Sequence, residues 1–278
     1  MGNNDKQFSL TVLGTRGSMA VSGDDTAKYG HATSCYLVET ETEAIILDAG
    51  NGILNAPDTG DKKISLLISH THIDHVLGLP MFLGKSRGKE ISVYGVTREG
   101  LTIKQQIEIY LKRPLWPITM DYYPVKLEFC GISEEARFHL GPVEVTAIES
   151  NHPGGSTIFA LRHDGKRIIY ATDFEHDDRD DRVFSKLVTF SEGADLVLYD
   201  AQYSPEQYQK CRSFGHSTYE KALELYEKAH IKEMMLIHHA PFNTDEMIDS
   251  MAKELSEISE AAKAGHIRFA KEGDIWKA

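Results

Sequence analysis

The chain has 278 residues, of which 41% are hydrophobic and 26% charged, and its formal net charge at pH 7 is −12. A chain of this length can bury a substantial core, and we expect residues 1–278 to form one domain. The negative net charge argues against nucleic acid as a partner. Short basic groups such as Lys112 and Arg113 still allow a local basic strip on the surface.

The composition also argues against a membrane protein or a disulfide-rich one. No apolar run approaches the roughly 18 residues that a membrane span needs, and the first six residues contain no apolar signal region. The three cysteines, Cys35, Cys130 and Cys211, are far apart, so they predict neither a disulfide framework nor a thiolate zinc site. We therefore expect a soluble, cytoplasmic protein without a membrane partner.

The first half of the chain alternates strand and turn signals. Tight loops at residues 14–18 and 48–52 separate short apolar runs, and two later segments have helical periodicity. The expected strands are residues 8–13, 34–39, 43–47, 64–68 and 91–94, and the expected helical segments are 80–83 and 99–111.

The second half shows the same richness in strands, with turns expected at Gly131, Gly141, residues 154–155 and residues 164–165. The expected strands are residues 143–148, 167–171, 196–199, 234–237 and 267–269, and the expected helices are 217–230 and 244–264. Ser217 or Thr218 would cap the first of these helices. Because no linker separates the two halves, we expect an α+β fold of two packed mixed sheets with outer helices.

The most informative stretch is S-H-T-H-I-D-H at residues 69–75, directly after an expected strand. Alternate residues of an extended segment point the same way, so His70 and His72 can converge on one ion. Asp74 and His75 lie where the chain turns, and they can face a second point nearby. Imidazole and carboxylate together suit Zn²⁺, Mn²⁺ or Fe²⁺ better than hard cations such as Ca²⁺. The stretch therefore predicts a metal site rather than a histidine-rich surface loop.

Three further candidate ligands follow other apolar strands. His152 follows the strand at 143–148, Asp173 follows residues 168–172, and His238 follows 234–237. A single histidine after a strand is often only a hydrogen-bonded turn residue. The recurrence of such residues at the same structural place favours a shared metal site.

In order and spacing, these seven side chains resemble the metal ligands of the metallo-β-lactamase-fold superfamily of hydrolases, and the resemblance covers nearly all of the chain. It implies an αββα sandwich with two divalent ions, zinc by default and manganese or iron as alternatives, at one edge of the sheets. It implies that one metal is bound by His70, His72 and His152 and the other by Asp74, His75 and His238, with Asp173 bridging both.

The same resemblance bears on two neighbouring residues. His238 is preferred over His239, because family members place the ligand three residues before a proline, here Pro241. Asp48 occupies a turn in which the family has an aspartate. It either orients a metal ligand or forms a simple turn.

The branch of the superfamily is indicated by a second motif, G-H-S-T at residues 215–218, which resembles a segment of ribonuclease Z and related phosphodiesterases. There the histidine reaches the active site, so His216 is expected near a phosphate oxygen unless it only caps the following helix. By contrast, His72 disfavours the oxygen-reducing diiron branch, which has an acidic residue there. Asp173 disfavours the antibiotic-hydrolysing branch that has a cysteine there.

Two features depart from ribonuclease Z. Only residues 153–172 separate His152 from Asp173, which is too short for the arm that grips tRNA. Tyr199 and Asp200 replace a second His/Glu motif, so the acid–base relay is expected to be incomplete. Small-substrate phosphodiesterases of the superfamily are the better match.

We therefore expect a dinuclear metal-dependent hydrolase, a phosphodiesterase acting on a small or cyclic phosphodiester through a metal-bridging hydroxide. Asp74 and His216 are the expected catalytic residues, with His216 binding a phosphoryl oxygen or protonating the leaving group. A lactone or thioester hydrolase is the alternative, whereas RNA processing of the ribonuclease Z type and a non-catalytic sensor are disfavoured. Trp116, Tyr122 and Tyr123 either line the substrate pocket or belong to the core. The sequence is also compatible with a homodimer.

Overall fold

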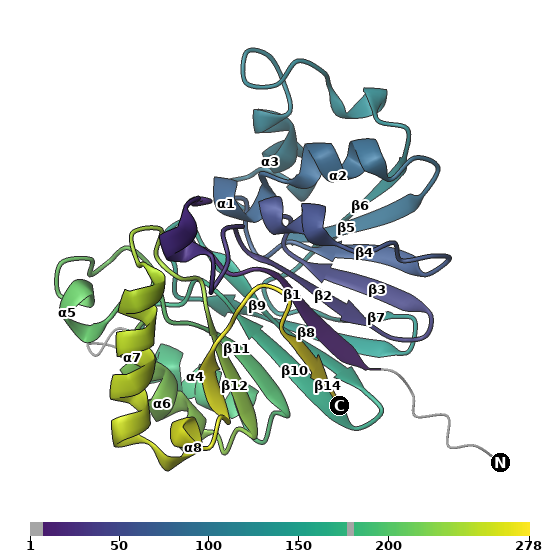
Figure 1. Ribbon diagram of the computed structural model, residues 1–278. Helices are drawn as coiled ribbons and strands as arrows, with labels where there is room; N and C mark the ends of the chain where they lie inside the picture. The colour runs from purple at the N-terminus through teal and green to yellow at the C-terminus, as the bar shows by residue number, and fades with distance from the viewer. Residues whose placement is uncertain (1–7, 177–180) are drawn as a thin grey trace.

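The structure is a computed structural model that describes residues 8–176 and 181–278, and within these ranges two seven-stranded sheets pack face to face. Helices cover the outer face of each sheet (Figure 1). The predicted sandwich of two mixed sheets with outer helices is therefore confirmed. The first six residues, expected to hold no signal region, lie outside the described residues. None of the described helices is long and apolar enough to span a bilayer.

The first sheet is antiparallel on one side and parallel on the other. Its strand order is β14 (Ile275–Lys277), β1 (Ser9–Gly14), β2 (Cys35–Glu39), β3 (Glu43–Leu47), β4 (Lys63–Leu67), β5 (Glu90–Val96) and β6 (Lys126–Ile132). Strands from β3 to β6 are parallel neighbours, which requires crossover connections. The helical segments of this half are η1 (Asp24–Thr26), η2 (Asn51–Asn55), α1 (Ile73–Val76), α2 (Leu79–Lys85), α3 (Ile103–Tyr110) and η3 (Met120–Tyr122).

The second sheet repeats this plan. Its strand order is β13 (Ile267–Phe269), β12 (Glu233–Ile237), β11 (Leu196–Asp200), β10 (Lys166–Ala171), β9 (Ser156–His163), β8 (Val143–Ser150) and β7 (Arg137–Leu140). Strands β7 to β10 are antiparallel, and β10 to β13 are parallel. The helices of this half are α4 (Asp181–Ser191), α5 (Pro205–Tyr208), α6 (Tyr219–Lys228), α7 (Asp245–Ile258) and α8 (Glu260–Lys263).

Apolar side chains fill three layers, one between the sheets and one beneath each set of helices. Strand β10 shows why the central strands read as continuous apolar runs. Ile168 and Tyr170 point between the sheets, whereas Ile169 and Ala171 point towards the outer helices. Because both faces of this strand are buried, the sequence does not alternate with polar residues.

The predicted strands and helices are found, with small shifts at their ends. Gly131 was expected in a turn but lies inside β6, paired with Gly95 of β5, so that prediction is wrong. The helix expected at 244–264 is broken at Ser259, whose extended backbone and hydroxyl cap α8. Thr218, rather than Ser217, caps α6. Helix α4 was not predicted.

Candidate metal centre and active site

The seven side chains predicted as metal ligands all lie at one edge of the sandwich, next to the ends of strands. His70 and His72 follow β4, and Asp74 and His75 lie on α1 directly after them. His152, Asp173 and His238 follow β8, β10 and β12 in the opposite sheet. The structure therefore brings the two sheets together at this edge and gathers ligand atoms from both.

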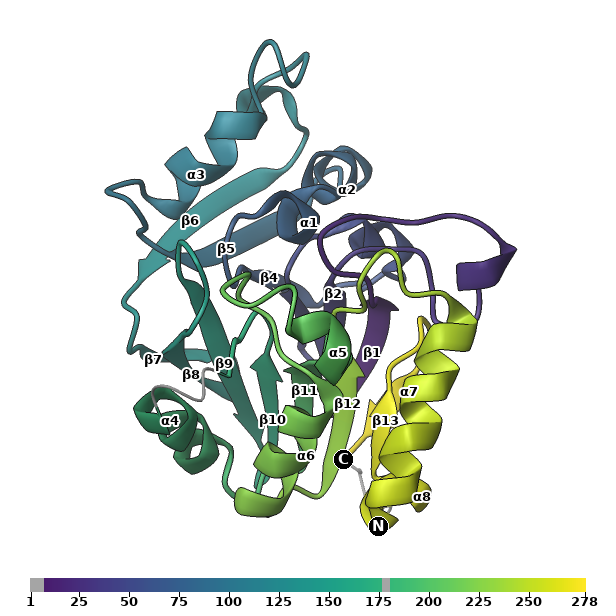
Figure 2. The ribbon, with the colours of Figure 1, turned by 90° about the vertical axis from the view of Figure 1, so that its left-hand side faces the viewer.

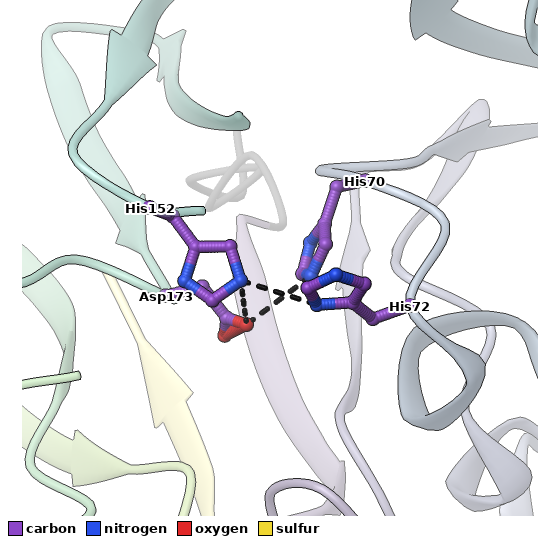
Figure 3. Close-up of side chains that lie close together, drawn as sticks. All are labelled: His70, His72, His152 and Asp173. Carbon is purple, nitrogen blue, oxygen red and sulfur yellow. Dashed lines mark hydrogen bonds and ion pairs between the residues drawn. The ribbon is translucent and has the colours of Figure 1, made fainter. Parts of the chain in front are cut away.

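One group of ligand atoms is formed by His70, His72, His152 and Asp173, all within 4.8 Å of one another (Figure 3). Nε2 of His152 lies 3.1 Å from Nδ1 of His72 and 3.7 Å from Oδ2 of Asp173. Nε2 of His70 lies 3.3 Å from the same oxygen. The three imidazoles thus converge on one carboxylate oxygen.

The second group consists of Asp74, His75 and His238. Nε2 of His75 and Nε2 of His238 lie 3.2 Å apart, and each lies 3.2 Å from Oδ2 of Asp74. Oδ1 of Asp173 lies 3.1 Å from Nε2 of His238. Oδ2 of Asp173 lies 3.3 Å from Nε2 of both His70 and His75, and Oδ1 faces His238, so this carboxylate contacts both groups.

In His70 and His152, the hydrogen bond made by Nδ1 shows that Nε2 is the ring nitrogen that carries the lone pair. The hydroxyl of Ser69 donates to Asp48, so Nδ1 of His70, 3.1 Å from that hydroxyl oxygen, must be the donor to it. Nδ1 of His152 likewise donates to the carbonyl of Gly215. The inward Nε2 of His70 is buried and, among the described residues, has no hydrogen-bond partner. Buried nitrogen lone pairs that face one another are costly unless a cation binds between them, so the donor set fits divalent metal ions.

Asp48 is the residue that orients His75. Its fully buried carboxylate accepts hydrogen bonds from the backbone and hydroxyl of Ser69 and from the hydroxyl of Tyr170. Oδ2 also lies 2.7 Å from Nδ1 of His75. Such a carboxylate fixes the ring orientation and leaves Nε2 directed at the cluster. Of the two roles considered for Asp48, the structure therefore supports the orienting one.

His216 lies beside the cluster, and Asp200 holds it there. Its ring centroid is 5.4 Å from that of His152 and 4.9 Å from that of His238. Nδ1 of His216 is 2.8 Å from Oδ2 of the fully buried Asp200, which also accepts the N–H of Asp173. Asp200 thus gives His216 a carboxylate partner, although the replacement of the His/Glu motif by Tyr199 and Asp200 had led us to expect an incomplete relay. The signal was present in the sequence, since Asp200 ends an apolar strand just as Asp173 follows one.

At Asp48, Asp173 and His238 the backbone adopts the left-handed conformation. The φ angle is 59° at Asp48, 50° at Asp173 and 66° at His238. L-residues other than glycine rarely adopt this conformation, and such strain is concentrated at functional sites. The surrounding structure therefore holds these side chains at specific positions after their strands.

Two glycines allow close approach to the imidazoles. A Cβ atom on Gly17 would lie 2.3 Å from Nδ1 of His238, and one on Gly215 would lie 2.1 Å from Nδ1 of His152. Any larger residue would push these rings away from the cluster. Gly17 and Gly215 thus have a steric role.

The two groups differ in electrostatics. Burial lowers the pKa of His70, with a further contribution from the nearby His75, and burial also lowers the pKa of His72 and of His152. Burial alone would lower the pKa of His238 too, but Asp173 and a hydrogen bond to Asp74 raise it to about 9. Excess negative charge therefore surrounds the second group of ligand atoms, and this charge favours a bound cation there.

His239 does not belong to the cluster. Its Nε2 donates to the carbonyl of Ala270 at 2.8 Å, and burial lowers its pKa to about 3. His238 is the histidine that faces the cluster, in agreement with the preference stated from the sequence.

A cavity of about 210 Å³ adjoins His70 and His72. Arg98, from the segment between β5 and α3, and Gln106, on α3, contribute to its walls. None of the three aromatic residues considered from the sequence lines it among the described residues. Tyr123 is buried in the core, Trp116 packs against that core and donates to the Tyr123 hydroxyl, and Tyr122 is exposed.

Comparison with known proteins gives a family match. The model of the beta-lactamase superfamily domain matches residues 43–239, a range that includes every residue of the cluster. Among curated relatives, ribonuclease Z of Bacillus velezensis is 22% identical, with 92% of this chain and 96% of the relative covered. Ribonuclease Z of Natronomonas pharaonis is also 22% identical, with 82% and 86% covered.

Solved structures show the same fold. The metallo-beta-lactamase fold protein YhfI from Bacillus subtilis is similar with a TM-score of 0.74 at 18% identity, with 99% of this chain and 100% of that chain covered. A diphosphatase from the PhnP family has a TM-score of 0.67 at 18% identity, with 98% of both chains covered. The human short-form tRNase Z has a TM-score of 0.64 at 20% identity, with 96% and 98% covered.

Proposed function

Because the chain belongs to the beta-lactamase superfamily, whose relatives indicate a metal-dependent hydrolase, we propose that it hydrolyses a small or cyclic phosphodiester. The observation that carries this proposal is the pair His216 and Asp200 beside the histidine–carboxylate cluster. A proton donor next to a dinuclear metal site would assist the departure of an alkoxide from phosphorus.

We propose that the cluster holds two divalent ions, zinc by default, in the two groups described above. When bound, such ions activate a water molecule near neutral pH and neutralise charge on phosphoryl oxygens. Asp74 would act as a ligand that also helps to orient the attacking water, and the N–H of Ser18, 2.7 Å from its Oδ2, fixes the carboxylate in place. Asp173 lies between the groups and would contact both ions.

His216 would donate its proton from Nε2 to the leaving oxygen. Within residues 8–176 and 181–278, Nε2 of His216 has no hydrogen-bond partner, whereas Nδ1 is held by Asp200. The carboxylate of Asp200 holds the ring through Nδ1, which leaves Nε2 as the nitrogen that would deliver a proton and take it back from solvent. Such general-acid assistance is typically worth about 10²–10⁴-fold in rate.

The size of the substrate is inferred from the surroundings of the cluster. The cavity beside His70 and His72 has a volume of only about 210 Å³. Strands β9 and β10 are joined by a tight turn at Asp164 and Gly165, and no arm extends from this hairpin. These features favour a small phosphodiester.

Cleavage of RNA is the second candidate, because the curated relatives carry the name ribonuclease Z over most of this chain. A panel of substrates separates the candidates. Zinc- or manganese-loaded protein should hydrolyse bis(p-nitrophenyl) phosphate and a 2′,3′-cyclic nucleotide faster than a lactone, a thioester or a tRNA precursor. Preferential cleavage of the tRNA precursor or of a carbonyl ester would overturn the proposal.

A further inference from the structure

A second concentration of charged side chains lies on the outer face of the second sheet, between α4 and strands β7 to β10. Figure 2 shows α4 on this side of the sheet, next to β7 and β8. A cavity of about 670 Å³ opens there. Among the described residues, its charged lining consists of Arg137, Glu144, Arg162, Arg167, Arg182 and Lys186. An excess of cations in one cavity is unexpected in a chain with a net charge of −12.

Strand register places two of these cations directly opposite each other. Arg162 of β9 pairs with Arg167 of β10 on one side and with Glu144 of β8 on the other. Like charges in directly opposed positions destabilise a sheet. Burial lowers the pKa of Arg167, and Arg162 lowers it further. The fold therefore maintains a repulsive pair that a bound anion would relieve.

Nearby carboxylates neutralise only part of this charge. Arg137 pairs with Glu144 at 3.1 Å, and Lys186 pairs with Glu135 at 2.6 Å. The guanidinium of Arg167 donates a hydrogen bond to the backbone carbonyl of Glu192, and this carbonyl group carries no net charge. Arg162 is exposed and, in the part of the chain that the structure describes, has no hydrogen-bond or ion-pair partner. The carboxylates of Asp195 and Glu192 also act on the charge of Arg167, so the uncompensated charge is centred on Arg162.

The remaining walls are suited to an organic group. Ile148 and Ala160 of the sheet and the half-buried Phe190 of α4 supply apolar surface. The cavity volume falls within the range of about 300–1,000 Å³ that is usual for small-molecule sites. Guanidinium groups bind phosphates through paired hydrogen bonds, and an aromatic wall can contact a planar ring. We propose that this cavity binds a small phosphorylated molecule of nucleotide size, at a site separate from the histidine–carboxylate cluster.

Calorimetric titration of the full chain with ADP and GDP tests this proposal. A chelator is present throughout, so that binding through a metal ion is removed. We expect saturable binding of at least one nucleotide, weaker binding of pyrophosphate and none of adenosine. Arg162→Gln should weaken nucleotide binding by about tenfold or more, because one charge-assisted contact is lost.

Two control variants make the result specific. Arg87→Gln removes an exposed arginine from the turn after α2, over the other sheet, and should leave the affinity unchanged. Asp173→Ala should also leave it unchanged, which distinguishes this site from the proposed catalytic one. Failure of both nucleotides to bind, equal affinity in Arg162→Gln, or binding of an RNA oligonucleotide alone would overturn the proposal.

Discussion

The histidine–carboxylate cluster brings several imidazoles together, and the arginine-lined cavity brings several cations together. The two sites differ in how firmly neighbouring groups fix these side chains. In the cluster, His75 and His152 are fixed through their second nitrogen by Asp48 and a backbone carbonyl. In the cavity, Arg162 is an exposed side chain with no partner among the described residues. Ligand atoms held in place suit a cation with a defined coordination geometry, whereas an exposed guanidinium without a partner can turn towards a phosphate. We therefore expect substitutions in the cluster to have far larger effects.

The largest effect is expected for Asp173→Ala, because this carboxylate contacts both groups of ligand atoms. Turnover of bis(p-nitrophenyl) phosphate should fall on the order of 10³-fold or more, together with the metal content. Elemental analysis and the rate are measured on the same preparation. Asp121→Ala, at an exposed position, is the control and should retain both. Full metal content and turnover in Asp173→Ala would show that the cluster is not the catalytic centre.

His216→Ala should separate catalysis from metal binding. Because His216 is proposed as the proton donor and not as a ligand, the rate of 2′,3′-cyclic nucleotide hydrolysis, which releases an alkoxide, should fall by about 10²–10⁴-fold while the metal content stays unchanged. His266→Ala removes an exposed histidine at the start of β13 and should be without effect. Loss of metal in His216→Ala would instead make this residue a ligand, and an unchanged rate would remove its catalytic role.

Asp48→Asn should weaken metal binding through His75 without removing a ligand. The amide replaces a carboxylate oxygen that lies 2.7 Å from Nδ1 of His75, so the ring loses a charged partner. Loss of such a partner typically lowers metal affinity by about 10–100-fold. Competition with a chromogenic chelator measures the affinity, and circular dichroism establishes that the variant is folded. Affinity equal to that of the wild type would reduce Asp48 to a turn residue.

The smallest effect is expected in the cavity. Without a ligand, Arg162→Gln removes the repulsion with Arg167, so the free energy of unfolding should stay equal or rise by about 0.2–1 kcal/mol. Urea denaturation measures it. A fall of more than about 1 kcal/mol would mean that Arg162 stabilises the sheet, and the contrast with the cluster would disappear.

Much of the fold and of the cluster could be predicted from the sequence, because the ligands lie close together in the chain or directly after apolar strands. Four candidate ligands are adjacent in residues 69–75, and the other three follow apolar strands, whose ends meet at one edge of the sandwich. The sequence showed that Asp200 ends an apolar strand, but its pairing with His216 was missed because it depends on how the segment between β11 and α6 folds back onto the end of β11. The break at Ser259 was missed because the surrounding residues keep helical periodicity through it.

The arginine-lined cavity could not be predicted, since its cations are spread over residues 137–186 and only strand register brings them together. Arg162 and Arg167 are separated by a hairpin turn, and their opposition follows from the pairing of β9 with β10. Clusters formed by a contiguous motif can be read from the chain, whereas clusters formed by register need the structure.

The stoichiometry of metal uptake tests the central claim most directly. Protein treated with a chelator and then titrated with Zn²⁺ should bind about two ions per chain, as a dinuclear site requires, and Asp173→Ala should lose this capacity. Uptake of no ion by the wild-type protein, or equal uptake by the variant, would contradict the account.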